Sequence, residues 1–375
     1  MTDFKRKLFA NLKNIGWPVT NRKLIVFESD DWGSNRMPSI EVYNQLVKEG
    51  VLSPNPSHYD KYDTIARAKD LEFLFDTLCT VRDRNGSPAV ISPFVNPSNP
   101  DFGKIRQSNF QNYYPERFDV TLDRLGEKEN VMNLWKQGIS GNIFIPAFHG
   151  REHLNVPSWI QHLQKRNEKV VKSFNLNFYS VPLNSLPEFL DAFRPALYFS
   201  KEEQIPQLVS SVYEGVNQMK ELFGQSPKVF CPPNGISHPV FDKESANSGI
   251  ELVMTNRLRS EPDGHGQLSK SFYSYNSKNK WNQRFYYRNC MFEPTYSRNA
   301  INICLMQIEA SFRCFKPAII STHRVNYIGS LEPKNREIGL NELQKLLKHI
   351  VKRWPDSEFI SSNDLINIFQ KASKT

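Results

Sequence analysis

Seven short, unbroken apolar segments restrict the fold more than any other feature of this sequence. Runs of about four to eight apolar residues are expected for strands that are covered on both faces. The runs alternate with segments of helical periodicity, and this alternation favours a mostly parallel sheet. Seven strands in one chain predict a closed or nearly closed barrel, with an open doubly wound sheet as the main alternative. The expected strands are residues 23–29, 88–96, 142–150, 228–235, 250–256, 317–326 and 357–362.

The segments between these strands carry signals for the ends of helices. Ser39 is placed to cap one helix, and Ser200 with Glu203 resembles a capping box at the start of another. Glycines at the far ends of several segments are typical of helix termini. The expected helices cover residues 39–50, 63–86, 200–224 and 341–354.

The predicted organisation is a single domain preceded by a short helical extension. Residues 1–22 form an N-terminal helical extension, and residues 23–375 form the barrel, with long insertions around 98–130 and 258–300 that shape a cleft. The second insertion is rich in aromatic residues, which either stack on sugar rings or form the core of a β insertion. These residues are Tyr273, Tyr275, Trp281, Tyr286 and Tyr287.

Charge and cysteine content exclude several classes of protein. The net charge of +9 is spread along the chain without a basic block, so a nucleic-acid-binding arm is not expected. Five cysteines without a C-x-x-C pair indicate neither a disulfide framework nor a zinc knuckle. The chain has no apolar run of about 18 residues that could cross a membrane, and its N-terminus lacks the apolar stretch of a signal peptide. The predicted location is the cytoplasm.

Polar residues that suit catalysis follow three of the expected strands. Asp30 and Asp31 follow the first strand, His149 and His153 follow the third, and His323 follows a late strand. The carboxyl ends of the strands in a parallel barrel form one rim, which is where active sites lie. Two imidazoles and a carboxylate form a set that binds a divalent metal ion and leaves positions open for water or substrate.

Two adjacent aspartates allow a division of roles at such a centre. One binds the ion, and the other remains free to take a proton from a water whose pKa the ion has lowered. His323 is then placed to protonate a leaving group. Glu152 directly precedes the second histidine, so the pattern is not H-E-x-x-H, and a zinc protease is excluded. The sequence also lacks the alternating strands expected of a non-haem iron oxygenase.

Five short motifs, in this order, resemble those of the polysaccharide deacetylases (carbohydrate esterase family four, NodB-homology domain). "ESDDWG" resembles the family's T/S-F-D-D-G motif, "HGREHL" its H-S/T-x-x-H motif, and "FCPPNG" its R-x-P-Y-G motif. "STHRVN" lies where the family has its late histidine, and "SEFISSNDL" resembles the closing strand and helix. The resemblance covers residues 23–367, nearly the whole chain.

The resemblance implies a distorted (β/α) barrel that removes N- or O-acetyl groups from sugars. Asp30 would be the general base and His323 the general acid. Asp31, His149 and His153 would bind a divalent metal ion, usually zinc. The oxyanion and substrate positions would fall on Asn234, Pro233, Arg257 and Arg151, with Glu152 orienting the ligands behind them.

The sequence departs from the family pattern at two of these positions. Cys231 stands where the family has an arginine that pairs with the base, and Asn234 stands where it has tyrosine. Arg257, Arg151 and Arg324 are the candidates to replace the missing guanidinium.

The function predicted from the sequence is a metal-dependent deacetylase acting on an acetylated carbohydrate, with no nucleic-acid partner. One alternative is an amide hydrolase that acts on a non-sugar substrate, such as a urea-like or cyclic imide compound, on the same barrel. The other is a carbohydrate-binding protein of weak activity that retains the metal site.

Overall fold

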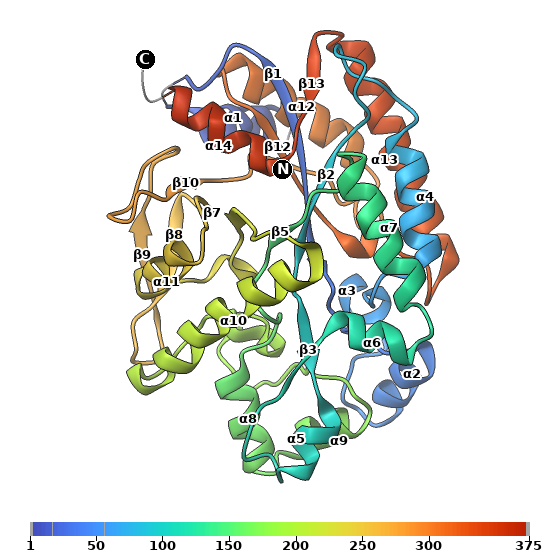
Figure 1. The fold of residues 1–375 in the computed structure, drawn as a ribbon, viewed down its shortest axis with the longest axis vertical. Helices are drawn as coiled ribbons and strands as arrows, with labels where there is room; N and C mark the ends of the chain where they lie inside the picture. Colours follow the sequence, from blue (N-terminus) through green and yellow to red (C-terminus); the bar gives the residue numbers. More distant parts are fainter. Residues whose placement is uncertain (1–2, 17, 56, 373–375) are drawn as a thin grey trace.

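Nine strands of the part of the chain that the structure describes form one parallel sheet, and helices surround it (Figure 1). The computed structural model describes residues 3–16, 18–55 and 57–372. The strand order is β10-β7-β6-β5-β2-β1-β12-β11, and β13 pairs with the first residues of β1. This arrangement is a distorted (β/α) barrel and confirms the predicted fold class. The strands are β1 (Lys23–Trp32), β2 (Ile91–Val95), β5 (Ala147–Phe148), β6 (Val229–Phe230), β7 (Leu252–Met254), β10 (Arg284–Tyr286), β11 (Cys290–Met291), β12 (Ala318–His323) and β13 (Ser357–Phe359).

All seven predicted strands are present, and the sheet has two more. The additional strands, β10 and β11, lie within 258–300, a range expected to be only an insertion. Each of them has two or three residues, too few to show a periodicity. The same range also contains the antiparallel pair β8 (Leu258–Pro262) and β9 (Leu268–Phe272), and the range 98–130 contains the pair β3 (Ser98–Pro100) and β4 (Pro115–Arg117).

Helices pack around the sheet and at its ends. Of the predicted helix signals, the Ser39 hydroxyl accepts a hydrogen bond from the backbone N–H of Val42, and Gly224 ends its helix at φ +76°. The capping box at Ser200 is absent, because the backbone N–H groups of residues 200 and 201 donate to Gln204 instead. The helices are α1 (Asp3–Asn14), α2 (Ile40–Lys48), α3 (His58–Tyr62), α4 (Ala68–Leu78), α5 (Phe102–Gln107), α6 (Phe118–Arg124), α7 (Lys128–Ser140), α8 (Val156–Gln164), α9 (Glu168–Asn175), α10 (Ile205–Phe223), α11 (Asp242–Asn247), α12 (Ala300–Arg313), α13 (Pro333–Arg353) and α14 (Ser362–Ala372).

Several of these helices differ in extent from the predicted ones. The helix predicted over 63–86 is limited to α4, and the helix predicted over 341–354 is the second half of the longer α13. No helix in the described ranges combines the length and the apolar character needed to cross a bilayer.

Side chains of β1 alternate between the two faces of the sheet. Ile25 and Phe27 belong to a large apolar cluster that includes residues of the surrounding helices. Val26 points the other way, into a cluster with Leu365 and Phe369 of α14. By the same alternation, residues 28 and 30 are expected on the inner face with Val26, and residue 31 on the outer face.

A separate apolar cluster lies beyond the carboxyl ends of the strands. It joins residues of α2, α5, α8 and α9, which lie together in the lower part of Figure 1. The polar segments at the ends of β1 and β5 therefore lie between two apolar clusters, and their backbone is held on both sides.

Gly33 is the point where the chain leaves β1 in close contact with the loop after β2. Its φ is +87°, and a Cβ at this position would overlap the carbonyl oxygen of Asn96. The Asn96 side chain in turn donates to the carbonyl of His149 at 2.6 Å. Only glycine combines this backbone conformation with this contact.

Replacing Gly33 with alanine is expected to lower the free energy of unfolding by about 1–3 kcal/mol, because the backbone is strained and the Asn96 carbonyl has to move. Urea unfolding followed by circular dichroism measures the change. Gly86→Ala is the control, since Gly86 has a similar φ of +79° but a Cβ added there would meet no atom within 4 Å. An equal loss in both variants would rule out the contact with Asn96 as the cause.

Candidate active site

The carboxyl ends of the strands surround a cavity of about 400 Å³. Asp30 and Asp31 reach it from β1, His149 and His153 from the segment after β5, and His323 from the end of β12. Residues from distant parts of the sequence therefore meet at one edge of the sheet, as expected for the rim of a parallel barrel. The other lining residues are Arg36, Tyr59, Arg194, Cys231, Pro232, Asn234, Gly235, Met254, Asn256 and Ser321.

The backbone of Asp31 explains how two consecutive side chains reach the same cavity. Neighbouring residues of a regular strand point to opposite faces. Asp31, however, has φ +74°, and the pairing of β1 with β2 shifts register between Ser29 and Trp32. Such an irregularity turns a side chain out of the strand pattern, and strained backbone of this kind concentrates at functional sites.

Asp31, His149 and His153 converge on one point. The Oδ1 atom of Asp31 lies 3.6 Å from Nε2 of His149 and 3.3 Å from Nε2 of His153. All three side chains are buried. The Nδ1 atom of His149 is held by the carbonyl of Cys231 at 2.7 Å, which leaves Nε2 facing the aspartate.

This trio fits a divalent cation. The Oδ1 atom of Asp31 is buried and has no hydrogen-bond partner in the described part of the chain. At metal–ligand bonds of about 2.0–2.2 Å, neighbouring ligand atoms lie about 3.0–3.5 Å apart, close to the spacing found here. Burial lowers the pKa of His153 to about 3, so its imidazole is neutral. Burial raises the pKa of Asp31, but the charge of Arg36 is the largest of the opposing effects, and together they hold that pKa well below its usual value.

Arg36 is a member of the site that the sequence analysis missed. Its buried guanidinium lies 3.5 Å from Asp31 and 3.1 Å from Asp63. It therefore shares its charge between a candidate metal ligand and a carboxylate behind it. The sequence gives little indication that Arg36 belongs to the site, because Arg36 lies in a loop without periodicity, five residues beyond Asp31.

Asp30 is paired with Arg288, which no sequence argument identified. The Nη1 and Nη2 atoms of Arg288 lie 2.5 Å and 2.7 Å from the two carboxylate oxygens of Asp30. Burial raises the pKa of Asp30, but the charge of Arg288 and its hydrogen bonds to the carboxylate outweigh it and lower this pKa below its usual value. Asp30 is therefore ionised at neutral pH and able to accept a proton.

Three other arginines were expected to supply this guanidinium, and each is engaged elsewhere. Arg257 donates to the carbonyl of Ile15 at 2.9 Å, and Arg324 donates to Asp63 at 2.6 Å. Arg151 pairs with Glu152 at 2.6 Å. The guanidinium at Asp30 thus comes from the second residue after β10, a strand that the sequence did not reveal.

Glu28 holds Arg288 from behind. It is fully buried on the same face of β1 as Asp30, and its carboxylate accepts from Nε of Arg288 at 2.6 Å. The hydroxyls of Tyr286 and Ser362 also donate to Glu28, at 2.6 Å and 2.7 Å. These contacts position the guanidinium so that its two terminal nitrogens meet both oxygens of Asp30.

Replacing Arg288 with glutamine is expected to raise the pKa of Asp30, because the nearest positive charge is removed. The acid limb of the pH profile of kcat/KM should then move upward by about 1–3 in pH. Arg288→Lys keeps a charge but loses the two-pronged contact, so it should move the limb less. Arg257→Gln is the control and should leave the limb in place. A profile for Arg288→Gln that matches that of the unmodified protein would show that Arg288 does not set the pKa of Asp30.

His323 faces Asp30 across the cavity and is held from behind by an acid. Its Nε2 atom lies 3.8 Å from Asp30, and its Nδ1 atom lies 2.7 Å from Glu293. The Tyr59 hydroxyl lies 3.3 Å from the same Nδ1 atom. Burial lowers the pKa of His323, but Glu293 outweighs it and raises that pKa to about 9. The imidazole is therefore protonated at neutral pH, the form that can donate a proton.

Glu293→Gln is expected to lower the pKa of His323, because the negative charge that stabilises the imidazolium is lost. Activity that needs protonated His323 falls as the pH rises through this pKa, which is about 9 in the unmodified protein. The alkaline limb of the kcat profile should therefore move to lower pH in the variant. Glu309→Gln changes a half-buried acid on α12 that pairs with Arg313 and Arg353, and it serves as the control. An unmoved alkaline limb in Glu293→Gln would exclude His323 as its source.

The remaining predicted site residues divide into two groups. Asn234 lines the cavity in a turn where its φ is +55°. The second group consists of described residues that do not line the cavity: Pro233, Arg151, Glu152 and Arg257. Glu152 accepts from the Tyr113 hydroxyl at 3.2 Å as well as from Arg151, so it belongs to a buried cluster behind the loop.

Burial and packing bear on two further features, the Cys231 thiol and the aromatic residues of the second insertion. Cys231 lines the cavity, but burial raises the pKa of its thiol well above the usual value, which disfavours a thiolate nucleophile. The aromatic residues of 272–287 mostly contact each other: Tyr275 packs on Tyr287 at 4.8 Å between ring centroids, and Tyr273 packs on Phe285 at 4.5 Å. Tyr273, Tyr275, Tyr286 and Tyr287 thus help to form the core at this edge of the sheet, whereas Trp281 is half-buried and packs against Lys280.

Comparisons with solved structures find several that align with most of this chain at TM-scores below 0.5. No family model and no curated protein sequence matches it. A candidate polysaccharide deacetylase from Mycobacterium smegmatis is 12% identical, with 96% of this chain and 94% of that chain covered at a TM-score of 0.45. A candidate glycoside hydrolase/deacetylase from Parabacteroides distasonis is 7% identical, with 95% and 73% covered at a TM-score of 0.47. A family 4 carbohydrate esterase from Streptomyces lividans is 10% identical, with 90% and 91% covered at a TM-score of 0.36. Over most of its length, the chain is thus similar to such structures at low sequence identity.

Proposed function

We propose that this protein is a metal-dependent hydrolase that removes an N- or O-acetyl group from a sugar. One observation carries the proposal. The unpartnered Oδ1 atom of Asp31 lies between two imidazole nitrogens, in a cavity that also holds an ionised carboxylate at Asp30 and a protonated imidazole at His323. A base, an acid and a set of metal ligands in one cavity are what the hydrolysis of an acyl group needs.

Each residue has a distinct part in the proposed reaction. Asp31, His149 and His153 would hold the metal ion, which supplies a water of lowered pKa and polarises a carbonyl. Asp30, ionised beside Arg288, takes a proton from the attacking water at one of its carboxylate oxygens. His323 donates the proton on Nε2 to the leaving nitrogen or oxygen of the sugar. The proton that Asp30 gains and the one that His323 loses balance over the cycle.

The Arg288 pair supports an active enzyme over a binding protein that has lost its activity. The base has a charged partner in spite of Cys231, and two further groups, the Glu28 carboxylate and the Ser321 hydroxyl, hold that partner in place. A protein that only binds carbohydrate has no need for a buried, positioned pair of this kind.

The proposal is tested by incubating the purified protein with N-acetylated and O-acetylated sugar oligomers and measuring released acetate. We expect acetate release that stops after chelation and returns when zinc is added back. Release of ammonia from urea-like or cyclic imide compounds, with no acetate from any sugar, would replace the proposal by a non-sugar amide hydrolase. Binding of glycans that persists after chelation, with no turnover under any divalent metal, would replace it by a carbohydrate-binding protein.

A further inference from the structure

The N-terminal helix α1 packs on the protein with its small and polar residues and presents its large apolar residues to solvent. Ala10 and Asn14 are buried. Leu8, Phe9 and Leu12 are 46%, 60% and 44% exposed, and Ile15 just beyond the helix is 57% exposed. A surface helix normally buries its apolar stripe, so this orientation leaves an apolar face without a partner in the described part of the chain.

The apolar surface continues onto the neighbouring hairpin. Arg257 donates to the carbonyl of Ile15 and so links the end of α1 to the start of β8. Leu258 and Phe272 are paired across β8 and β9 and are 54% and 63% exposed. Together Leu8, Phe9, Leu12, Ile15, Leu258 and Phe272 form what we call the α1 patch. Scattered exposed apolar residues are common, but these six gather on α1 and on the hairpin that Arg257 joins to it, and exposed apolar residues gathered in this way mark an interaction site.

Positive charges accompany this apolar surface. Helix α1 carries Lys5, Arg6 and Lys7 in its first half. Two further arginines contact it from the body of the protein: Arg257 through the carbonyl of Ile15, and Arg313 through the side chain of Asn11 at 3.2 Å. The whole chain has a net charge of +9. Apolar side chains on one face with lysine and arginine beside them are the pattern of a helix that lies in a membrane interface.

We propose that the α1 patch binds the surface of a bilayer that contains anionic lipids. Leu8, Phe9 and Leu12 insert among the lipid chains at the headgroup boundary, and Lys5 and Lys7 contact the anionic headgroups. Two effects combine in this mode: burial of apolar area and attraction between the cations and the negative surface.

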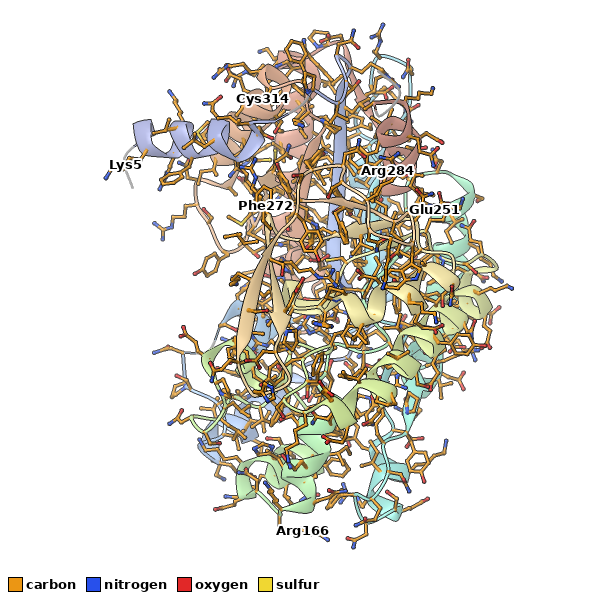
Figure 2. The ribbon with its side chains drawn as sticks, turned by 90° about the vertical axis from the view of Figure 1, so that its left-hand side faces the viewer. Lys5, Arg166, Glu251, Phe272, Arg284 and Cys314 are labelled. Atoms are coloured by element: carbon orange, nitrogen blue, oxygen red, sulfur yellow. The ribbon has the colours of Figure 1, made fainter. Side chains whose placement is uncertain are left out.

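The shape of α1 favours a bilayer over a second protein. Figure 2 shows α1 projecting from the body of the molecule, with Lys5 toward its outer end and Phe272 on the hairpin below. A projecting helix can enter a soft lipid surface, whereas stable protein interfaces bury large, closely complementary surfaces. The basic residues beside the apolar stripe fit an anionic surface and would repel each other across a symmetric dimer.

The test is co-sedimentation of the full chain with vesicles of phosphatidylcholine, with and without phosphatidylglycerol. We expect binding to the vesicles that contain phosphatidylglycerol, weakened at high salt. Phe9→Ser with Leu12→Ser should lower the partition coefficient by about tenfold or more, and Lys5→Glu with Lys7→Glu should weaken binding chiefly at low salt. Ile338→Ser, which changes a 52% exposed residue on α13, is the matched control and should bind like the unmodified protein. Circular dichroism confirms that the variants fold.

Three results would overturn the proposal. The first is that the unmodified protein sediments with neither kind of vesicle. The second is that Ile338→Ser loses as much binding as the α1 variants. The third is that analytical ultracentrifugation finds a dimer that Phe9→Ser with Leu12→Ser converts to a monomer, which would assign the α1 patch to a second copy of the chain. The outcome does not depend on whether the cavity removes acetyl groups.

Discussion

Asp30→Asn is expected to lower kcat for acetate release by about 10²–10⁴-fold, because the amide cannot accept a proton from the attacking water. The metal content should stay at the level of the unmodified protein, since Arg288 binds both carboxylate oxygens of Asp30 and the predicted ligands are Asp31, His149 and His153. Stopped assays of acetate, together with elemental analysis of the same samples, measure both quantities.

The neighbouring aspartate provides the matched control for this prediction. Asp31→Asn changes the same chemical group one residue later, and it should lose both the metal and the activity. If Asp30→Asn retained full activity, Asp30 would not be the base. If it lost the metal as Asp31→Asn does, the division of roles between the two carboxylates would be wrong.

His153→Ala is expected to weaken zinc binding by about 100-fold or more, since it removes a ligand of the ion. Even the loss of a group that only holds such a ligand in place lowers metal affinity by about 10–100-fold. Activity should fall with the metal content. The structural reason is that Nε2 of His153 lies 3.3 Å from Oδ1 of Asp31, so its loss opens one side of the site. Dialysis against a series of zinc concentrations, followed by elemental analysis, measures the affinity.

A second histidine tests whether the loss is specific. His162→Ala changes a residue of α8 whose Nδ1 atom contacts the carbonyl of Ser158, away from the cavity. It should bind zinc like the unmodified protein. If His153→Ala bound zinc with the same affinity, His153 would not be a ligand of the ion. A group other than the pair of Asp31 and His149 would then have to complete the site.

Much of the architecture follows from local sequence patterns. The seven predicted strands lie where the unbroken apolar runs are, because a run covered on both faces has to be apolar along its whole length. The strands missed, β10 and β11, have two or three residues each, and pairing with a neighbour, not composition, defines them. The start of α10 was misplaced because a short turn, Glu202–Gln204, precedes the helix, and Gln204 accepts from the backbone N–H groups of residues 200 and 201 without capping α10.

The position of five polar residues after the predicted strands was enough to predict that they share one rim, because the carboxyl ends of parallel strands lie at the same edge of a sheet. Asp30, Asp31, His149, His153 and His323 were identified in this way, and the structure places all five around one cavity. Their roles remain predictions until the variants are measured.

Tertiary structure alone decided what surrounds those side chains. Arg288 binds Asp30 although it lies 258 positions later in the sequence. Glu293 and Arg36 reach the site from segments without any periodicity. Asp31 faces the cavity only because its backbone leaves the strand conformation at φ +74°. A local pattern specifies which residues end a strand, whereas the pKa of a buried acid depends on charges within a few ångströms, and those charges come from wherever the folded chain brings them.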